Sequence, residues 1–198
     1  MKHGRREALI LGAAGLAAAA TGFLVGPFLL QQVNRDGAGE KTAPGNIALF
    51  SANLVDLAGR PRQLNEWRNR ILICNFWATW CAPCREEIPL LMAAREKYAF
   101  LGLEIVGIAI DNASKVRDFT RSLNIPYPVL LAEADGLDLM RKLGNTAGGL
   151  PYTVVTDRQG NVLHRKLGAF HQGDLDAILG PLARTWAGRG PEERCNFG

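Results

Sequence analysis

The sequence contains few of the residues that usually bind metal ions, with only four cysteines and three histidines in 198 residues. Two of the cysteines, Cys81 and Cys84, form a Cys-x-x-Cys pair, but a structural zinc site needs four ligands and this pair supplies two. The other cysteines are isolated, and the histidines show no ligand spacing with one another. These absences argue against a zinc site, and we expect no metal ion and no organic cofactor.

A large excess of charge of one sign is also absent, since Lys and Arg number 23 and Asp and Glu 19, a net charge of +4. The first 30 residues hold three of the basic residues and one of the acidic ones, which leaves 20 against 18, or +2, for the rest. Part of the basic character therefore comes from the N-terminus, and the composition does not predict a nucleic-acid partner.

One stretch near the N-terminus, between Glu7 and Arg35, contains no charged residue. The stretch is rich in Ala, Leu, Gly and Phe, and it is long enough to cross a bilayer as one helix. Because basic residues precede it, we expect residues 1–30 to be a membrane anchor with a cytoplasmic N-terminus. The alternative is a cleaved signal peptide, cut near Ala18–Ala20. In both cases the segment after Arg35 is exported, and we expect it in a bacterial periplasm.

The rest of the chain divides by composition into three parts. Residues 31–46 are polar and rich in Gly, Asp, Glu and Pro, which predicts a flexible linker. Residues 47–189 have the size of one domain, which is large enough to bury a core without structural disulfides. Residues 190–198 form a polar tail.

The Cys-x-x-Cys pair directly follows an apolar run, Ile71–Phe76, that predicts a buried central strand. Apolar residues at helical spacing continue from Arg85 to Tyr98, so the pair lies where a strand leads into a helix. Backbone N–H groups and the dipole at the helix N-terminus stabilise a thiolate at Cys81, whereas Cys84 lies one turn further in. An exposed thiol that attacks, beside a shielded one that resolves the mixed disulfide, predicts a dithiol–disulfide active site.

Strands and helices alternate through the rest of the domain, which predicts parallel strand pairing with right-handed crossovers. The further extended segments are 48–51, 53–56, 62–64, 104–110, 129–131, 152–156 and 161–167, and the further helices are 112–123, 136–143 and 172–186. Asp157–Gly160 predicts a hairpin turn between the last two strands. We therefore expect an α/β, thioredoxin-like fold with an added N-terminal β-hairpin, preceded by one transmembrane anchor helix.

Two motifs support a resemblance to a known family. The segment Asn75–Pro89, with the sequence NFWATWCAPCREEIP, and the segment Gly148–Thr153, with the sequence GGLPYT, resemble the membrane-anchored, extracytoplasmic thioredoxin-like proteins of the TlpA/ResA type. The resemblance covers about residues 47–182 and implies a redox-active disulfide between Cys81 and Cys84. At the position of Asn75, a general thioredoxin usually has an aspartate.

The resemblance also implies roles for residues around the cysteines. Glu87 matches a glutamate that is thought to assist proton transfer; the alternative is a solvated charge in the first turns of a helix. Leu150 and Pro151 match a loop with a cis peptide bond that faces the cysteines and presents its main chain to a bound partner. The alternative for Pro151 is an ordinary proline at the start of a strand. Trp80 and Pro83 are expected to shape the client-binding surface.

Two cysteines lie outside the pair. Cys74 falls in the predicted central strand, where a free cysteine behaves as a small buried apolar side chain. The alternative is a Cys74–Cys195 disulfide, which an oxidising compartment would permit if the tail folds back to within about 7 Å between the α-carbons. Otherwise Cys195 is free or paired between molecules.

The resemblance implies that the protein reduces disulfides of client proteins, namely cytochrome c precursors or proteins of the copper site of cytochrome oxidase. It also implies a membrane electron donor of the CcdA or DsbD type. Oxidation or isomerisation of exported proteins is the alternative, because the redox potential depends on the electrostatics around Cys81. A copper-binding chaperone that uses His164 is an alternative of another class, although such relatives have Cys-x-x-x-Cys. A peroxidase is a weaker alternative.

Overall fold

The computed structural model describes residues 48–132, 135–171 and 173–187. The predicted anchor (1–30), linker (31–46) and tail (190–198) lie outside the described residues. Within the described ranges, no helix is both long and apolar enough to span a bilayer.

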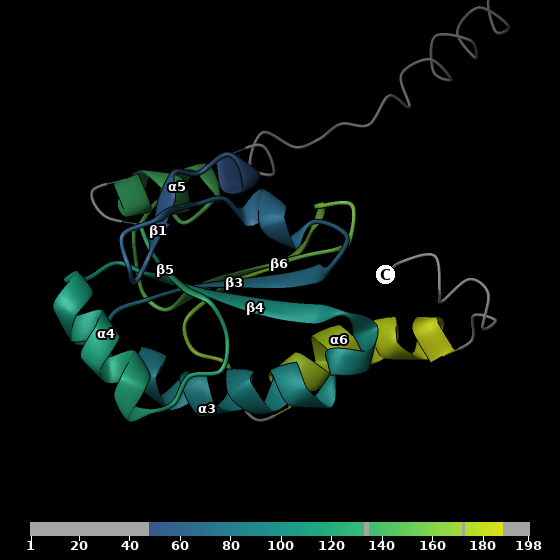
Figure 1. Cartoon of the computed structure of the whole chain (residues 1–198). Helices are drawn as coiled ribbons and strands as arrows, with labels where there is room; N and C mark the ends of the chain where they lie inside the picture. Colours follow the sequence, from purple (N-terminus) through teal and green to yellow (C-terminus); the bar gives the residue numbers. More distant parts are fainter. Residues whose placement is uncertain (1–47, 133–134, 172, 188–198) are drawn as a thin grey trace, which may run out of the picture. The chain divides into compact units, whose positions relative to one another are not determined.

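Seven strands of the described chain form one mixed sheet (Figure 1). They are β1 (Leu54–Asp56), β2 (Pro61–Arg62), β3 (Ile71–Trp77), β4 (Leu103–Ala109), β5 (Val129–Leu131), β6 (Tyr152–Thr156) and β7 (Val162–Leu167), in the order β2-β1-β5-β4-β3-β6-β7. β3 pairs in parallel with β4, which pairs in parallel with β5, and β6 is antiparallel to β3. The carboxyl ends of β3, β4 and β5 therefore lie at one edge of the sheet, where the Cys-x-x-Cys pair follows β3.

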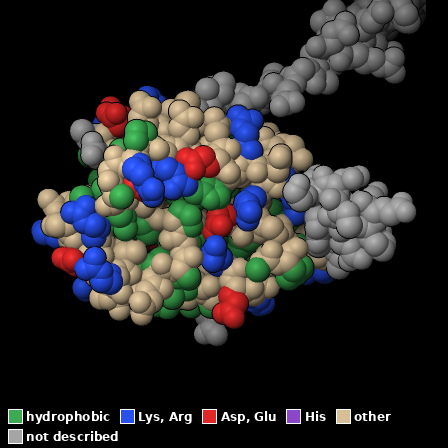
Figure 2. All heavy atoms as spheres, in the orientation of Figure 1, with side chains coloured by type: hydrophobic (Ala, Val, Ile, Leu, Met, Phe, Trp, Pro, Cys, Tyr) green, Lys and Arg blue, Asp and Glu red, His purple; other side chains and the backbone are tan. Residues whose placement is uncertain are grey.

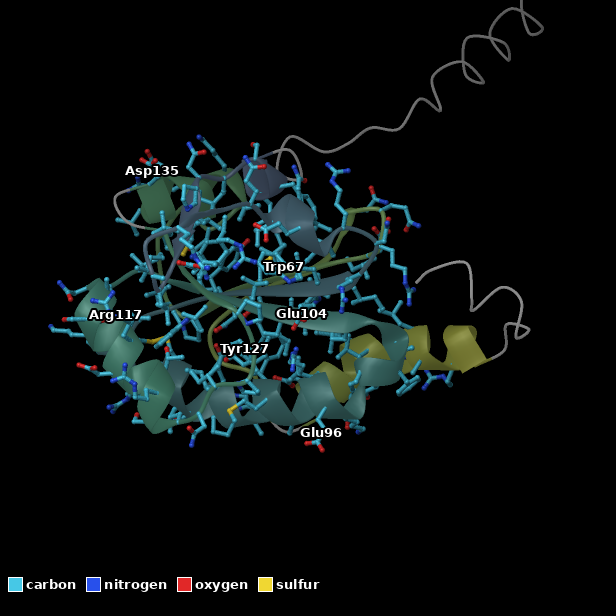
Figure 3. All side chains as sticks on the ribbon, in the orientation of Figure 1. Trp67, Glu96, Glu104, Arg117, Tyr127 and Asp135 are labelled. Carbon is cyan, nitrogen blue, oxygen red and sulfur yellow. A yellow bond between two sulfur atoms is a disulfide. The ribbon has the colours of Figure 1, made fainter. Side chains whose placement is uncertain are left out.

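Helices cover both faces of the sheet (Figure 1). They are η1 (Leu64–Trp67), α3 (Ala82–Lys97), η2 (Ala99–Leu101), α4 (Ala113–Ser122), α5 (Gly136–Lys142) and α6 (Asp174–Ala187). One hydrophobic core forms where α3, α4 and α6 pack on the first face, and a second forms where α5, η1 and the helical residues 48–50 pack on the other. Trp67 and Tyr127, labelled in Figure 3, belong to these two cores on opposite sides of the sheet.

β3 is central to the fold because it is buried along its whole length. Its side chains alternate between the two cores, as the period of two in a strand requires. Ile71, Ile73 and Trp77 lie in the core with α3, whereas Leu72, Cys74 and Phe76 lie in the core with α5. A continuous apolar run is thus explained by a strand that is covered on both faces.

The predicted central strand, the active-site helix and the hairpin of the last two strands, β6 and β7, are confirmed. Two segments near the start of the domain differ from the prediction. Residues 48–50 are helical and not extended. The consecutive residues Leu49 and Phe50 are both buried in the α5 core, whereas in a half-exposed strand consecutive side chains would point to opposite faces.

The second difference concerns residues 62–64, which the sequence predicts to be extended throughout. The strand β2 ends at Arg62, and η1 begins at Leu64. The first turn of η1 is held by a hydrogen bond from the backbone N–H of Gln63 to the Glu66 carboxylate.

Cys74 is a fully buried free thiol, as the simpler of the two interpretations predicts. Burial raises the pKa of this thiol because the thiolate would be desolvated. Cys74 also belongs to the core on the face opposite the Cys81–Cys84 pair, which is in the α3 core. Cys195, its predicted alternative partner, lies outside the described residues.

The burial of Cys74 predicts a defined pattern of thiol labelling. In a Cys195→Ser variant with the Cys81–Cys84 disulfide intact, we expect no reaction with a maleimide in the native state. Denaturation without reductant should expose one reactive thiol, which mass spectrometry would locate at Cys74. Rapid labelling of the native protein would contradict the fold. In the unsubstituted chain, no reactive thiol after denaturation would support the Cys74–Cys195 bridge instead.

Candidate active site

A disulfide joins Cys81 and Cys84 at the N-terminus of α3, with 5.3 Å between the α-carbons. Cys81 is the N-cap residue, and the backbone N–H of Cys84 donates a hydrogen bond to its sulfur at 3.3 Å. Pro83 occupies the first turn, where a helix does not need the missing N–H. Cys81 keeps a small exposed fraction of 5%, whereas Cys84 is completely buried. Both cysteines are therefore largely buried, and the predicted asymmetry is reduced to a small exposed fraction at Cys81.

Glu87 lies on the same buried face of α3 as Cys84, which it follows by three residues. Its side chain is completely buried and is held by two hydrogen bonds. Oε1 accepts from the Asn75 amide at 2.7 Å, and Oε2 accepts from the backbone N–H of Phe170 at 2.8 Å. The Asn75 amide also donates to Thr153 Oγ1 at 3.0 Å, because the pairing of β3 with β6 places these two residues opposite each other.

Burial raises the pKa of the Glu87 carboxyl above its ordinary value, because water no longer solvates the charge. The hydrogen bonds from Phe170 and Asn75, together with the positive charge of Lys166, oppose this shift but do not cancel it. A carboxyl with a raised pKa can hold and release a proton closer to neutral pH than an exposed glutamate.

The loop before β6 contains a cis peptide bond between Leu150 and Pro151. Its conformation is held by two hydrogen bonds. The Asn145 amide donates to the Gly149 carbonyl at 2.8 Å, and the backbone N–H of Gly168 donates to the Pro151 carbonyl at 2.9 Å. Tyr152 pairs with Phe76 near the end of β3. Pro151, which precedes Tyr152, therefore adjoins the end of β3 from which the chain continues to Cys81.

Exposed and buried aromatic residues flank the disulfide. Trp80, directly before Cys81, is 69% exposed, whereas Trp77 is buried against Phe119 of α4. Pro83 is exposed, and Leu150 is half-buried. Among the described residues, no group of three His, Cys, Asp or Glu side chains is placed to hold a metal ion.

Comparison with known proteins identifies the family. Residues 44–165, more than half of the chain, match the AhpC/TSA family. The chain belongs to the AhpC/TSA family.

Relatives of this AhpC/TSA protein carry names that refer to disulfide chemistry. It is 28% identical to the thiol-disulfide oxidoreductase ResA of Bacillus cereus over 129 residues, which cover 64% of this chain and 71% of that protein. It is 34% identical to the thiol:disulfide interchange protein HelX of Rhodobacter capsulatus over 116 residues, 57% of this chain and 61% of that protein. The crystal structure of a thiol:disulfide interchange protein of the thioredoxin family from Chlorobium tepidum matches with a TM-score of 0.57 and 30% identity, covering 66% of this chain and 93% of that one.

These comparisons confirm the predicted thioredoxin-like fold and the resemblance to ResA-type thiol-disulfide oxidoreductases. They do not assign individual residues, so the site must be judged from its geometry. That geometry contradicts one of the two interpretations of Glu87, since a completely buried side chain with two hydrogen-bond donors is not a solvated charge.

The hydrogen-bond partners of Glu87 are not evident from the sequence. Asn75 stands out in the sequence only as a departure from the aspartate of general thioredoxins, and Phe170 carries no signal of a role at the site. Phe170 contributes a backbone N–H, which no side-chain pattern reveals, and it lies 83 residues from Glu87 in the sequence. The polar Asn75 within an otherwise apolar buried strand was the available clue, because a buried amide must find hydrogen-bond partners.

The Asn75–Glu87 hydrogen bond predicts a pH-dependent loss of stability in an Asn75→Ala variant. Removing the amide leaves Glu87 Oε1 without its donor and should lower the free energy of unfolding by about 1–3 kcal/mol. A folded-state pKa that is already raised would rise further, and a raised carboxyl pKa means that stability falls as the pH rises through it. The deficit against wild type should therefore be larger at pH 8 than at pH 4, as measured by urea unfolding.

A Thr153→Val variant provides the matched control for this experiment. It removes the other hydrogen-bond partner of Asn75 and leaves the Glu87 carboxylate and its two donors in place. We expect its stability deficit to be nearly independent of pH. An equal pH dependence in both variants would contradict the proposed link between Asn75 and the ionisation of Glu87.

Proposed function

We propose that the protein is an extracytoplasmic thiol-disulfide oxidoreductase that reduces disulfides of client proteins. The observation that carries this proposal is a disulfide at a helix N-terminus with a buried carboxyl, Glu87, on the same helix face as its shielded cysteine. Names of the ResA and HelX relatives support the reaction class. The disulfide form described above is the product of the reductive reaction.

The reaction begins with the dithiol form of the protein. The Cys81 thiolate, stabilised by the backbone N–H groups and the dipole of α3, attacks one sulfur of the client disulfide. A mixed disulfide forms between Cys81 and the client, and the other client sulfur leaves as a thiolate that takes up a proton. Cys81 is better suited to the attack than Cys84 because it is the one of the two that keeps some exposed surface.

Resolution uses the buried side of the site. Glu87 accepts the proton of the Cys84 thiol, and the resulting thiolate attacks the Cys81 sulfur. The Cys81–Cys84 disulfide forms, and the second client sulfur leaves as a thiolate and takes up a proton. Two electrons have passed from the protein to the client. Asn75 and Phe170 hold the carboxylate of Glu87 in place for this step.

The client polypeptide binds on the surface around Cys81. The exposed Trp80 directly precedes this cysteine and the exposed Pro83 follows it in the first turn of α3, and the half-buried Leu150 and the main chain at Pro151 lie where β3 meets β6. The face in view in Figure 2 mixes Lys and Arg side chains with Asp and Glu, and hydrophobic side chains are visible between them.

The proposed setting is the periplasmic side of a bacterial inner membrane. The uncharged N-terminal stretch between Glu7 and Arg35 is the basis for an anchor, which would keep the domain close to a membrane electron donor of the CcdA or DsbD type. The proposed clients, by resemblance to the TlpA/ResA type, are cytochrome c precursors or proteins that assemble the copper site of cytochrome oxidase.

The roles of the two cysteines predict opposite results for two serine variants. Cys81→Ser should abolish the reduction of client disulfides, because it removes the attacking sulfur. Cys84→Ser should accumulate mixed disulfides between Cys81 and clients, because resolution is blocked. Affinity purification under non-reducing conditions followed by mass spectrometry would identify the trapped proteins. The absence of trapped proteins with Cys84→Ser, or trapping with Cys81→Ser, would contradict the assignment.

The direction of electron flow predicts the redox state of the protein in its own cells. An electron supply from a membrane donor should keep Cys81 and Cys84 mostly as thiols, since a reductase reacts in its dithiol form. Alkylation in acid-quenched cells, followed by gel separation of the labelled forms, measures the fraction. A mostly oxidised pair would support a disulfide oxidase or isomerase in place of a reductase.

A further inference from the structure

The segment between β3 and Cys81 is held by a carboxylate from outside the predicted site. Asp111, which follows the end of β4, accepts two hydrogen bonds from Thr79 through its Oδ2 atom. The backbone N–H of Thr79 donates one at 3.0 Å, and its hydroxyl donates a shorter one. The other oxygen, Oδ1, accepts from the backbone N–H of Asn112 at 2.7 Å. Oδ2 therefore connects the segment after β3 to the segment after β4, whereas the Oδ1 contact is local to the Asp111 segment.

Neighbouring main-chain hydrogen bonds fix the same segment. The Trp77 carbonyl accepts from the backbone N–H of Ile110 at 2.9 Å, and the Ala78 carbonyl accepts from the backbone N–H of Cys81 at 3.2 Å. Together with the bonds at Thr79, these contacts hold the backbone on both sides of the exposed Trp80. The position of Cys81 is thus determined in part by the chain that leaves β4.

Asp111 also adjoins the start of α4. The next residue, Asn112, is the N-cap of this helix and accepts from the backbone N–H of Ser114 at 2.9 Å. Burial alone would raise the pKa of Asp111, but the hydrogen bonds from Thr79 and Asn112 and the charge of Lys115 outweigh it and hold the pKa below its ordinary value. Asp111 is therefore negatively charged at neutral pH. Its carboxylate is held at a fixed place by Thr79, which lies two residues before Cys81 in the sequence.

We propose that Asp111 is a positioning residue that fixes the Cys81 segment through Thr79, and that its negative charge disfavours the Cys81 thiolate and makes the dithiol a stronger reductant. A like charge close to a thiolate destabilises it, which opposes the stabilisation by the helix N-terminus. Charged side chains on the elements around this site include Arg85, Glu86 and Glu87 on α3, Lys115, Arg117, Asp118 and Arg121 on α4, and Arg165 and Lys166 on β7. This inference rests on the proposed thiol-disulfide function.

Equilibration with glutathione tests the effect of the charge. Two glutathione thiols reduce the Cys81–Cys84 disulfide and become glutathione disulfide, so two electrons and two protons pass to the protein. In Asp111→Asn, which has nearly the same shape, one oxygen can still accept from Thr79. We expect the equilibrium constant at pH 8 to shift about threefold to tenfold toward the protein dithiol, and the pKa of the Cys81 thiol to fall.

Two further variants change a charge without touching the Thr79 hydrogen bonds. Asp118→Asn removes the same charge from an exposed position on α4 and should leave the equilibrium constant unchanged. Lys115→Gln removes the positive charge that acts on Asp111 and should shift the equilibrium in the opposite direction, toward the disulfide. Because Lys115 is exposed, this variant keeps the test informative if Asp111→Asn fails to fold.

The positioning role is tested separately by Thr79→Val, which keeps the charge of Asp111 but removes the hydroxyl donor. We expect the rate of reaction with a protein disulfide to fall severalfold while the equilibrium constant with glutathione stays the same, because attack depends on the placement of Cys81. An equilibrium shift in Asp111→Asn no larger than in Asp118→Asn, or an equal shift in Thr79→Val, would overturn the inference. A wild-type disulfide that does not exchange with glutathione at all would instead contradict the proposed function.

Discussion

The hydrogen-bonded carboxylate of Glu87 is the interaction on which the active site depends. It connects α3 to β3 through Asn75 and to the turn before α6 through the backbone of Phe170. A buried charge without these partners would be strongly destabilising, so its presence requires the three segments to keep their relative positions. The helix that carries the disulfide is therefore fixed to the centre of the sheet by a polar contact as well as by apolar packing.

This arrangement separates two requirements of disulfide exchange. The attacking Cys81 must be stable as a thiolate, and at the helix N-terminus the backbone N–H of Cys84 donates to its sulfur. The shielded Cys84 must lose its proton in a place that water does not reach, and Glu87 lies on the same buried face of α3. Within the described part of the chain, the hydrogen bonds of the Asp111 carboxylate go to Thr79 and Asn112 and not to Glu87. The N-terminus of α3 thus places Cys81 at its cap, with a small exposed fraction, and Cys84 on the buried face that also carries Glu87.

The sequence predicted those parts of the structure that depend on local patterns. The apolar run Ile71–Phe76, the helical spacing after Cys84 and the turn at Asp157–Gly160 each determine their element within a few residues. The short apolar stretch at residues 48–50 was predicted wrongly, because periodicity cannot distinguish a buried helical turn from a strand over so few residues.

The environment of the site was less predictable than its residues. The role of Glu87 rested on resemblance, and its burial became clear only when contacts over long sequence separations were known. Phe170 and Asp111 lie far from the Cys-x-x-Cys pair in the sequence. Phe170 contributes a backbone N–H, and Asp111 contributes the carboxylate of a polar residue that follows a strand. Local composition does not distinguish such groups from ordinary turn residues.

The most direct test of the account is the pH dependence of mixed-disulfide resolution in wild type, Glu87→Gln and the neighbouring surface variant Glu86→Gln. If Glu87 accepts the proton of Cys84, the wild-type rate should rise with pH through a carboxyl pKa that lies above its ordinary value. Glu87→Gln should lose this inflection and resolve about a hundredfold more slowly at neutral pH, while Glu86→Gln behaves as wild type. Identical profiles for Glu87→Gln and wild type would contradict the central role given to this carboxyl.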